Sequence, residues 1–105
     1  MTDKKKPTFD LETLKGLIED TETRLITEMA QENASELGFY TDDIVECVRS
    51  LLRADFHKSM TTIKDHKLWQ DVYKPTYKEI QIYLKLQIGP EGECVVISFK
   101  RDEGD

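Results

Sequence analysis

The sequence predicts an α+β domain in which helices come first in the chain and cover one face of a mainly antiparallel β-sheet. Up to about residue 55, apolar residues recur every three or four positions, as in amphipathic helices. Beyond that point they recur every two positions, as in half-buried strands. The 105 residues allow one core of moderate size, so we expect a single domain over 1–105 with frayed ends at 1–8 and 102–105.

Three helices and one short edge strand are expected in the first half, each marked by a start or stop signal. Asp10 and Thr27 are favoured N-cap residues, Thr41 begins a polar and acidic helix start, and Gly38 can close a helix in the left-handed conformation. The expected ranges are 11–21, 28–37 and 41–53 for the helices and 24–26 for the strand. The apolar face of the third helix would consist of Ile44, Val45, Val48, Leu51 and Leu52.

The second half is expected to form four strands, and their short connections make neighbouring strands antiparallel. The expected ranges are 56–63, 68–75, 77–88 and 93–100. In the third strand, alternation places Ile80, Ile82, Leu84 and Leu86 in the core and Gln81, Tyr83, Lys85 and Gln87 on the opposite face. In the last strand, it places Val95, Ile97 and Phe99 in the core and Ser98 and Lys100 on the opposite face.

The two earlier strands are less regular. In the strand at 68–75, Trp69 and Tyr73 point inward only if Asp71 does too, and a buried carboxylate then needs a partner. In the strand at 56–63, the even-numbered residues Phe56 to Thr62 share one face, and neither face is clearly apolar. If Lys58 joins the outer row, the sheet presents a set of residues that we call the lysine face: Lys58, Gln70, Lys74, Tyr83, Lys85 and Lys100.

The lysine face has the chemistry to bind single-stranded RNA. Lysines neutralise phosphates, Tyr83 can stack on a base or transfer a proton, and Gln70 can donate an amide hydrogen bond. An ordinary solvated sheet face has a similar composition. The residue pattern alone leaves both interpretations open.

The distribution of charge bears on the class of partner. The net charge of −6 argues against non-specific coating of nucleic acid, which depends on cations facing phosphates. Residues 1–55 carry a balance of −6, however, and residues 56–101 a balance of +3, so a basic face on an acidic protein is compatible with the sequence. No apolar run is long enough to span a bilayer, and the default location is the cytoplasm.

Other chemically useful residues give weaker signals. His57 and His66 suggest an acid–base pair, but alternation and a turn position argue against it. A metal site made of Asp65, His66 and Asp71 has no recognised spacing, and we expect neither a metal nor a cofactor. Cys47 and Cys94 are far apart in the chain and match no zinc pattern, which favours buried free thiols over a disulfide.

Longer sequence motifs in the second half carry a family resemblance. The motifs are FHKSMTT from Phe56, DH from Asp65, WQDVYKP from Trp69, YLK from Tyr83 and VISFK from Val96. Together they resemble the MqsR family of bacterial toxins. The resemblance implies a RelE-like fold and a metal-independent, sequence-selective endoribonuclease that cleaves single-stranded mRNA and arrests growth. It also implies a neutralising MqsA-like antitoxin that carries zinc and a helix-turn-helix domain, so that DNA would be contacted only through the antitoxin. An exposed strand at 56–63 would offer that antitoxin an edge for pairing.

The resemblance also implies roles for individual residues. It assigns catalysis to Lys58, Gln70, Tyr83 and Lys100. We further expect Met60, Lys74 and Lys85 to contact RNA. The sequence departs from the family pattern at His57, where a tyrosine is usual, and at Lys74, where an arginine is usual. These departures and the acidic first half leave an alternative, namely a weak or inactive homologue that binds and regulates an antitoxin.

Overall fold

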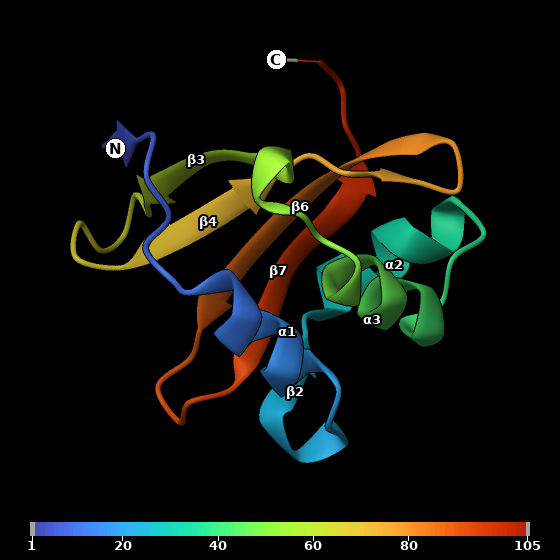
Figure 1. Ribbon diagram of the computed structural model, residues 1–105, viewed down its shortest axis with the longest axis horizontal. Coiled ribbons are helices and arrows are strands. Elements are labelled where there is room, and N and C mark those ends of the chain that lie inside the picture. Colours follow the sequence, from blue (N-terminus) through green and yellow to red (C-terminus); the bar gives the residue numbers. More distant parts are fainter. Residues whose placement is uncertain (1, 105) are drawn as a thin grey trace.

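The computed structural model describes residues 2–104 and contains three α-helices, two short 3₁₀ helices and seven strands (Figure 1). The α-helices are α1 (Leu11–Ile18), α2 (Glu28–Glu36) and α3 (Thr41–Arg49), and the 3₁₀ helices are Thr21–Thr23 and Arg53–Asp55. The strands are β1 (Asp3–Lys4), β2 (Arg24–Ile26), β3 (Phe56–Thr61), β4 (Trp69–Tyr73), β5 (Thr76–Tyr77), β6 (Ile80–Ile88) and β7 (Cys94–Arg101). None of the helices in this described part is long and apolar enough to cross a membrane.

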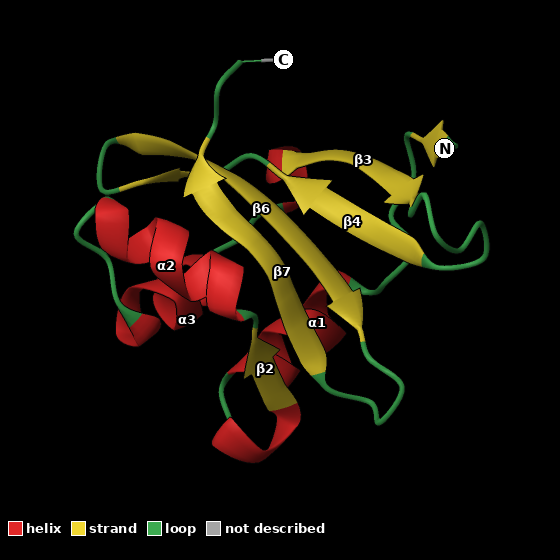
Figure 2. Cartoon of the chain, turned by 180° about the vertical axis from the view of Figure 1, so that it is seen from behind, coloured by secondary structure: helices red, strands yellow, loops and turns green. Residues whose placement is uncertain are grey.

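The strands form one sheet with the order β1-β3-β4-β6-β7-β2, and β5 pairs with β6 beside this path. All pairings are antiparallel except that of β2 with β7, which is parallel. The buried residues of all three helices share one core cluster with those of β6 and β7. Figure 2 shows the other face of β4, β6 and β7, with α1 behind the strands and α2 beside β7. The predicted fold class, α+β with helices on one face of a mainly antiparallel sheet, is therefore confirmed.

The helix boundaries follow from capping interactions. The Asp10 carboxylate accepts a hydrogen bond from the Thr13 amide at 3.0 Å, and Thr27 Oγ1 accepts one from the Ala30 amide at 3.1 Å, so both predicted N-caps are confirmed. Gly38 has φ +84°, as the left-handed helix end requires. Helix α1 ends at Ile18 rather than near residue 21, because Asp20 caps the 3₁₀ helix that follows.

The third helix is shorter than predicted. It ends at Arg49, and the chain does not continue as an α-helix but forms a 3₁₀ helix at Arg53–Asp55. Leu51 is 1% exposed, whereas Leu52 is 64% exposed. The prediction that Leu52 belongs to the apolar face is therefore wrong, because the last turn that would have aimed it inward does not form.

The predicted strand at 77–88 is in fact a hairpin. Lys78 and Glu79 have φ of 47° and 71°, and they form the turn between β5 and β6. Two positive φ values in succession are typical of the tightest hairpin turns, which usually contain asparagine and glycine. Because Lys78 and Glu79 stand at these positions, the residue types do not predict the turn.

Two irregularities in pairing change which side chains face the core. Phe56 pairs with Tyr73 and Lys58 with Val72, so His57 is the extra residue of a bulge and Phe56 does not share a face with Lys58. In β7, Leu86 pairs with Val96 and Lys85 with Ser98, which makes Ile97 the extra residue. Val95 is buried as predicted, but it pairs with Gln87 on the face opposite the main cluster. The prediction of Ile97 as a core residue is wrong, and the residues of β7 in the main core cluster are Cys94, Val96 and Phe99.

The N-terminal segment, residues 2–9, is ordered on the sheet. Asp3 pairs with Met60 and Lys4 with Ser59, so the predicted frayed end at 1–8 is wrong for these residues, and β3 is not an edge strand along this stretch. At the other end, the Asp102 amide donates to the Gln81 carbonyl at 2.8 Å. Both predicted frayed ends extend to residues 1 and 105, which lie outside the described residues.

The inward orientation of Asp71 is confirmed, and its partners are the backbone of the N-terminal segment. Asp71 is 0% exposed, and its carboxylate accepts hydrogen bonds from the Thr8 and Phe9 amides at 3.0 and 2.9 Å. Cys47 and Cys94 are both buried free thiols, as predicted. Burial raises the pKa of each thiol to about 12, which leaves both of them unreactive at neutral pH.

Candidate nucleic-acid interface

Cross-strand pairing brings the predicted residues onto one face of the sheet. Residues that pair directly point to the same face. Lys58 of β3 pairs with Val72 of β4, Val72 pairs with Lys85 of β6, and Lys85 pairs with Ser98 of β7. Two lysines from strands that are not adjacent therefore lie in one row, and the bulge at His57 is what brings Lys58 into it.

Two further rows flank this one. Met60 pairs with Gln70, and the Gln70 amide Nε2 donates to Gln87 Oε1 at 2.7 Å. Gln87 is 8% exposed, so this hydrogen-bonded pair holds a fixed position between β4 and β6. On the other side of the lysine row, Tyr83 pairs with Lys100. All members of the lysine face that β3, β4, β6 and β7 supply are thus neighbours in space.

Tyr83 lies near two ammonium groups. Lys100 Nζ is 5.3 Å from the centroid of the Tyr83 ring, and Lys85 Nζ is 5.8 Å from it. Cations within about 6 Å of an aromatic ring are attracted to its face. This contact holds both lysines over the tyrosine, so that the three side chains present two positive charges and a hydroxyl together.

The positive charges of the face act on one another. Burial, together with the charges of Lys100 and Lys58, holds the pKa of Lys85 below its ordinary value. The three ammonium groups therefore repel one another in the absence of an anion. A phosphate placed among them would relieve this repulsion, which is the electrostatic character expected of a phosphate-binding surface.

Two lysines of the lysine face form ion pairs with carboxylates. Lys58 Nζ lies 3.6 Å from Asp3 Oδ2, and Lys74 Nζ lies 3.5 Å from Asp102 Oδ1. The Lys74 and Asp102 side chains are only 16% and 9% exposed, so that pair is well enclosed. Within residues 2–104, Lys85 and Lys100 form no ion pair with a carboxylate.

The weaker candidates do not gather into a site. His66 lies in the exposed loop between β3 and β4, and the buried Asp71 carboxylate is occupied by backbone amides. Across the described residues, no three His, Cys, Asp or Glu side chains are arranged to hold a metal ion.

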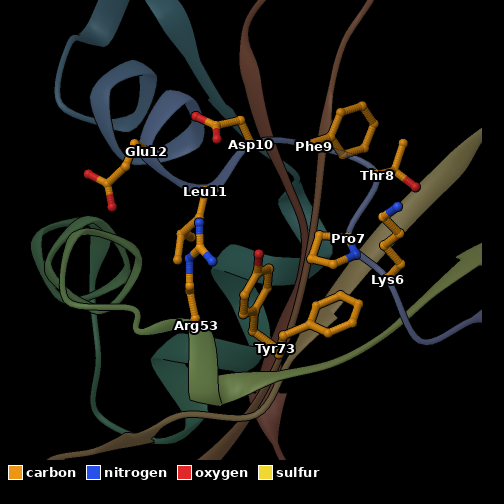
Figure 3. Close-up of a pocket in the computed structure, with 10 residues that line it drawn as sticks. Lys6, Pro7, Thr8, Phe9, Asp10, Leu11, Glu12, Arg53 and Tyr73 are labelled. Atoms are coloured by element: carbon orange, nitrogen blue, oxygen red, sulfur yellow. The ribbon is translucent and has the colours of Figure 1, made fainter.

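A separate pocket lies on the helix side of the sheet. It has a volume of about 420 Å³ and is bounded by the N-terminal segment, the start of α1, Arg53 and the inward-facing Phe56 and Tyr73 (Figure 3). The Tyr73 hydroxyl points into it in Figure 3, and burial raises the pKa of Tyr73 to about 12. No member of the lysine face lines this pocket, and no motif in the sequence predicts it.

Sequence reasoning missed two residues beside the lysine face. Gln87 was assigned to the outer row but given no role, and its contact with Gln70 depends on the register between β4 and β6. Asp3 was placed in a frayed end, although it reaches Lys58. No local signal marks either contact, because each joins residues that are remote in sequence.

The fold and the lysine face together define a small α+β protein whose sheet carries clustered lysines on the face that the helices do not cover (Figure 2). Residues 6–101 match the family described as "Motility quorum-sensing regulator, toxin of MqsA". Over 98 residues, which are 93% of this chain and 97% of its relative, the chain is 38% identical to the mRNA interferase toxin MqsR of Escherichia coli (strain K12). The chain therefore belongs to the MqsR toxin family, as the motifs predicted.

Proposed function

We propose that this chain is the toxin of a type II toxin–antitoxin system and that it cleaves single-stranded mRNA on the lysine face. The observation that carries the proposal is that Lys58 and Lys100 act on Lys85, that Lys85 and Lys100 lie near Tyr83, and that the Gln70–Gln87 pair lies in the next row. A relative that covers nearly the whole chain is named an mRNA interferase, which supports the same activity. A RelE-like architecture belongs to the proposal as well.

The proposed reaction needs no metal. The 2′-hydroxyl of one nucleotide loses its proton and attacks the adjacent phosphorus, the bond from phosphorus to the 5′ oxygen breaks, and that oxygen takes up a proton. The products are a 2′,3′-cyclic phosphate and a 5′-hydroxyl. Lys58 and Lys100 stabilise the negative charge that develops on the phosphorane, since two fixed cations beside the same anion act mainly in the transition state.

Proton transfer is assigned to Tyr83 and Lys85. Tyr83 carries a hydroxyl near the ammonium groups of Lys85 and Lys100. The lowered pKa of Lys85 makes a neutral amine more accessible there than at an ordinary lysine, so Lys85 can serve as the base while Tyr83 acts as the acid. The sequence predicts that Lys85 contacts RNA, and its surroundings favour this second role.

Base recognition is assigned to the row beside the lysines. Gln70 is held by Gln87, so its remaining amide hydrogen and carbonyl can read the edge of an unpaired base. Met60 pairs with Gln70 and provides an apolar surface next to it. Because Lys74 is enclosed with Asp102, its contact with RNA phosphate would require that ion pair to open.

The proposed partner is an MqsA-like antitoxin, which carries the zinc and the helix-turn-helix domain of the pair and neutralises the toxin in the cytoplasm. The family description names MqsA as the counterpart of its toxins. Because β1 covers Ser59 and Met60 of β3, the antitoxin would not add a strand along that part of β3. Expression of the chain alone should arrest growth, and expression of the antitoxin should relieve the arrest.

Cleavage of purified mRNA in the presence of EDTA tests the proposal. Lys58→Ala and Tyr83→Phe should each lose about 100-fold or more of the rate, the range expected for groups that stabilise charge or move a proton. Lys64→Ala, which changes an exposed lysine of the β3–β4 loop, is the matched control and should cleave like the wild type. Cleavage that EDTA abolishes, or that survives both variants, would contradict this mechanism.

One observation favours the alternative of a weak or inactive homologue that regulates an antitoxin. Lys58 and Lys74 are both paired with carboxylates, and the whole chain has a net charge of −6. Under this alternative the purified chain binds the antitoxin and changes its affinity for DNA, but leaves mRNA intact at every salt concentration.

A further inference from the structure

The N-terminal segment is fastened to the sheet at several points. The Thr61 amide donates to the Thr2 carbonyl at 2.8 Å, and the Phe9 amide donates to the buried Asp71 carboxylate at 2.9 Å. Between these two anchors, β1 pairs with β3 in a defined register. Residues 2–9 therefore hold their side chains at fixed positions on the sheet.

Alternation along β1 determines which of its side chains reaches the lysine face. Lys4 pairs with Ser59, which is fully buried on the helix side, and Lys4 Nζ lies 4.2 Å from the centroid of the Trp69 ring. This cation–π contact holds Lys4 to the helix side. Asp3 is the preceding residue and pairs with Met60, so it points to the opposite face, where the lysines lie.

Asp3 meets Lys58 on that face. Asp3 Oδ2 is 3.6 Å from Lys58 Nζ, and the two side chains are 58% and 28% exposed. An ion pair this exposed is weak and can be exchanged for another anion. A phosphate that approaches Lys58 must either displace Asp3 or share the ammonium group with it, and the carboxylate repels the phosphate in both cases.

We propose that Asp3 is a built-in competitor for the RNA phosphate at Lys58, so that the N-terminal segment sets the affinity of the lysine face. The inference rests on the proposed function, because it concerns the same surface and the same substrate. Asp3 takes no part in bond making or breaking. It lowers the affinity of the free protein for RNA by occupying one of the three clustered cations.

Binding of a single-stranded 2′-O-methyl RNA oligonucleotide tests this proposal. The blocked 2′-hydroxyl prevents cleavage, so fluorescence anisotropy measures affinity alone. Asp3→Asn should tighten binding roughly two- to fivefold at low salt, the range set by loss of an exposed ion pair. The gain should shrink as salt rises, because screening weakens both the ion pair and the repulsion of the phosphate.

Two controls separate this effect from a general change of charge or fold. Glu22→Gln makes the same charge change in the 3₁₀ helix before β2, at the opposite edge of the sheet from β1, and should leave affinity close to that of the wild type. In a Lys58→Ala background, Asp3→Asn should have no effect on affinity, because Asp3 no longer has the Lys58 ammonium group to occupy. The Asn side chain retains the size of Asp, and a thermal unfolding curve checks that β1 remains paired.

The outcomes distinguish the inference from the function on which it rests. If the wild type binds and Lys58→Ala weakens binding, but Asp3→Asn matches the wild type or binds less tightly, then the competitor role is wrong and the RNA-binding face stands. An equal gain from Asp3→Asn in the Lys58→Ala background would also overturn it. If no variant binds, including the wild type, then the RNA function fails and the inference fails with it.

Discussion

Lys85 is the residue of the lysine face with the most unfavourable surroundings for its charge. It is partly buried in the middle row of the sheet, and the charges of Lys100 and Lys58 add to the effect of burial on its pKa. The charged form is therefore less stable in the folded protein than in the unfolded chain. The charge of Lys85 therefore lowers the free energy of unfolding, and its removal should stabilise the protein.

Replacement of Lys85 tests this effect of its charge on stability. Lys85→Met keeps the length and apolar stem of the side chain and removes the charge, so it should raise the free energy of unfolding at pH 7. The native pKa is below the unfolded value of 10.5, so between the two values the unfolded chain binds more protons and wild-type stability rises with pH. The advantage of Lys85→Met should therefore be largest at neutral pH and shrink as pH approaches 10.5.

Urea unfolding at a series of pH values measures this difference. Lys64→Met is the matched control, because Lys64 is exposed in the β3–β4 loop, and it should change stability by less than about 0.5 kcal/mol at every pH. A stability difference between Lys85→Met and the wild type that does not depend on pH would show that packing, and not charge, sets it.

At the scale of elements, the β5–β6 hairpin joins the sheet to α3. The Tyr77 hydroxyl lies 2.9 Å from Asp43 Oδ1 and 2.7 Å from Glu46 Oε1, both on α3, and its single proton can be donated to either carboxylate. Lys78 Nζ lies 2.9 Å from the same Asp43 oxygen. Burial and hydrogen bonds to Glu46 and Asp43 raise the pKa of Tyr77, so the hydroxyl stays protonated and continues to donate. These contacts hold the hairpin in place although its turn carries unfavourable backbone angles.

The turn itself gives a prediction at this scale. Glu79 has φ 71°, a conformation that costs a residue with a side chain about 1–2 kcal/mol and glycine almost nothing. Glycine also loses more entropy on folding, so Glu79→Gly should stabilise the protein by about 0.5–1 kcal/mol in net terms. Thermal or urea unfolding measures the change. In the β6–β7 loop, Glu91 is exposed and its φ is not positive, so Glu91→Gly should not stabilise. Equal effects from the two variants would contradict the argument.

At the scale of the whole molecule, contacts remote in sequence tie the N-terminal segment to the same domain as the core. Asp71 of β4 binds the Thr8 and Phe9 amides, and β1 completes the sheet beside β3. A single core runs from α1 to β7. A chain of this size with one core is expected to unfold in one cooperative step, with the β1–β3–β4 edge included.

The single tryptophan allows this expectation to be tested. Trp69 lies at the start of β4 under Lys4, so its fluorescence reports the β1–β3–β4 edge, while far-UV circular dichroism reports the whole chain. The two urea transitions should coincide. Lys4→Ala, which removes the cation from the ring, should cost about 0.5–1 kcal/mol and move both curves together. A fluorescence transition at lower urea than the dichroism would show that this edge unfolds separately.

The sequence by itself determined the features that depend on local signals. Caps at Asp10 and Thr27 and the left-handed Gly38 were predicted because a cap involves only its own first or last turn. Alternation in β6 placed Tyr83 and Lys85 on the outer face because the side-chain period of a strand is fixed at two. The inward Asp71 was predicted on the same ground, and the motifs around these residues indicated the family.

Only the tertiary structure decided the features that depend on pairing between remote segments. The bulges at His57 and Ile97 break the period of two, so that Lys58 joins the outer face without Phe56, and Val95 is buried on the face of Gln87. A bulge forms where two strands must keep their pairing while one of them has an extra residue, and neither strand alone reveals it. The contact of Asp3 with Lys58 has the same origin, because it exists only when β1 pairs with β3.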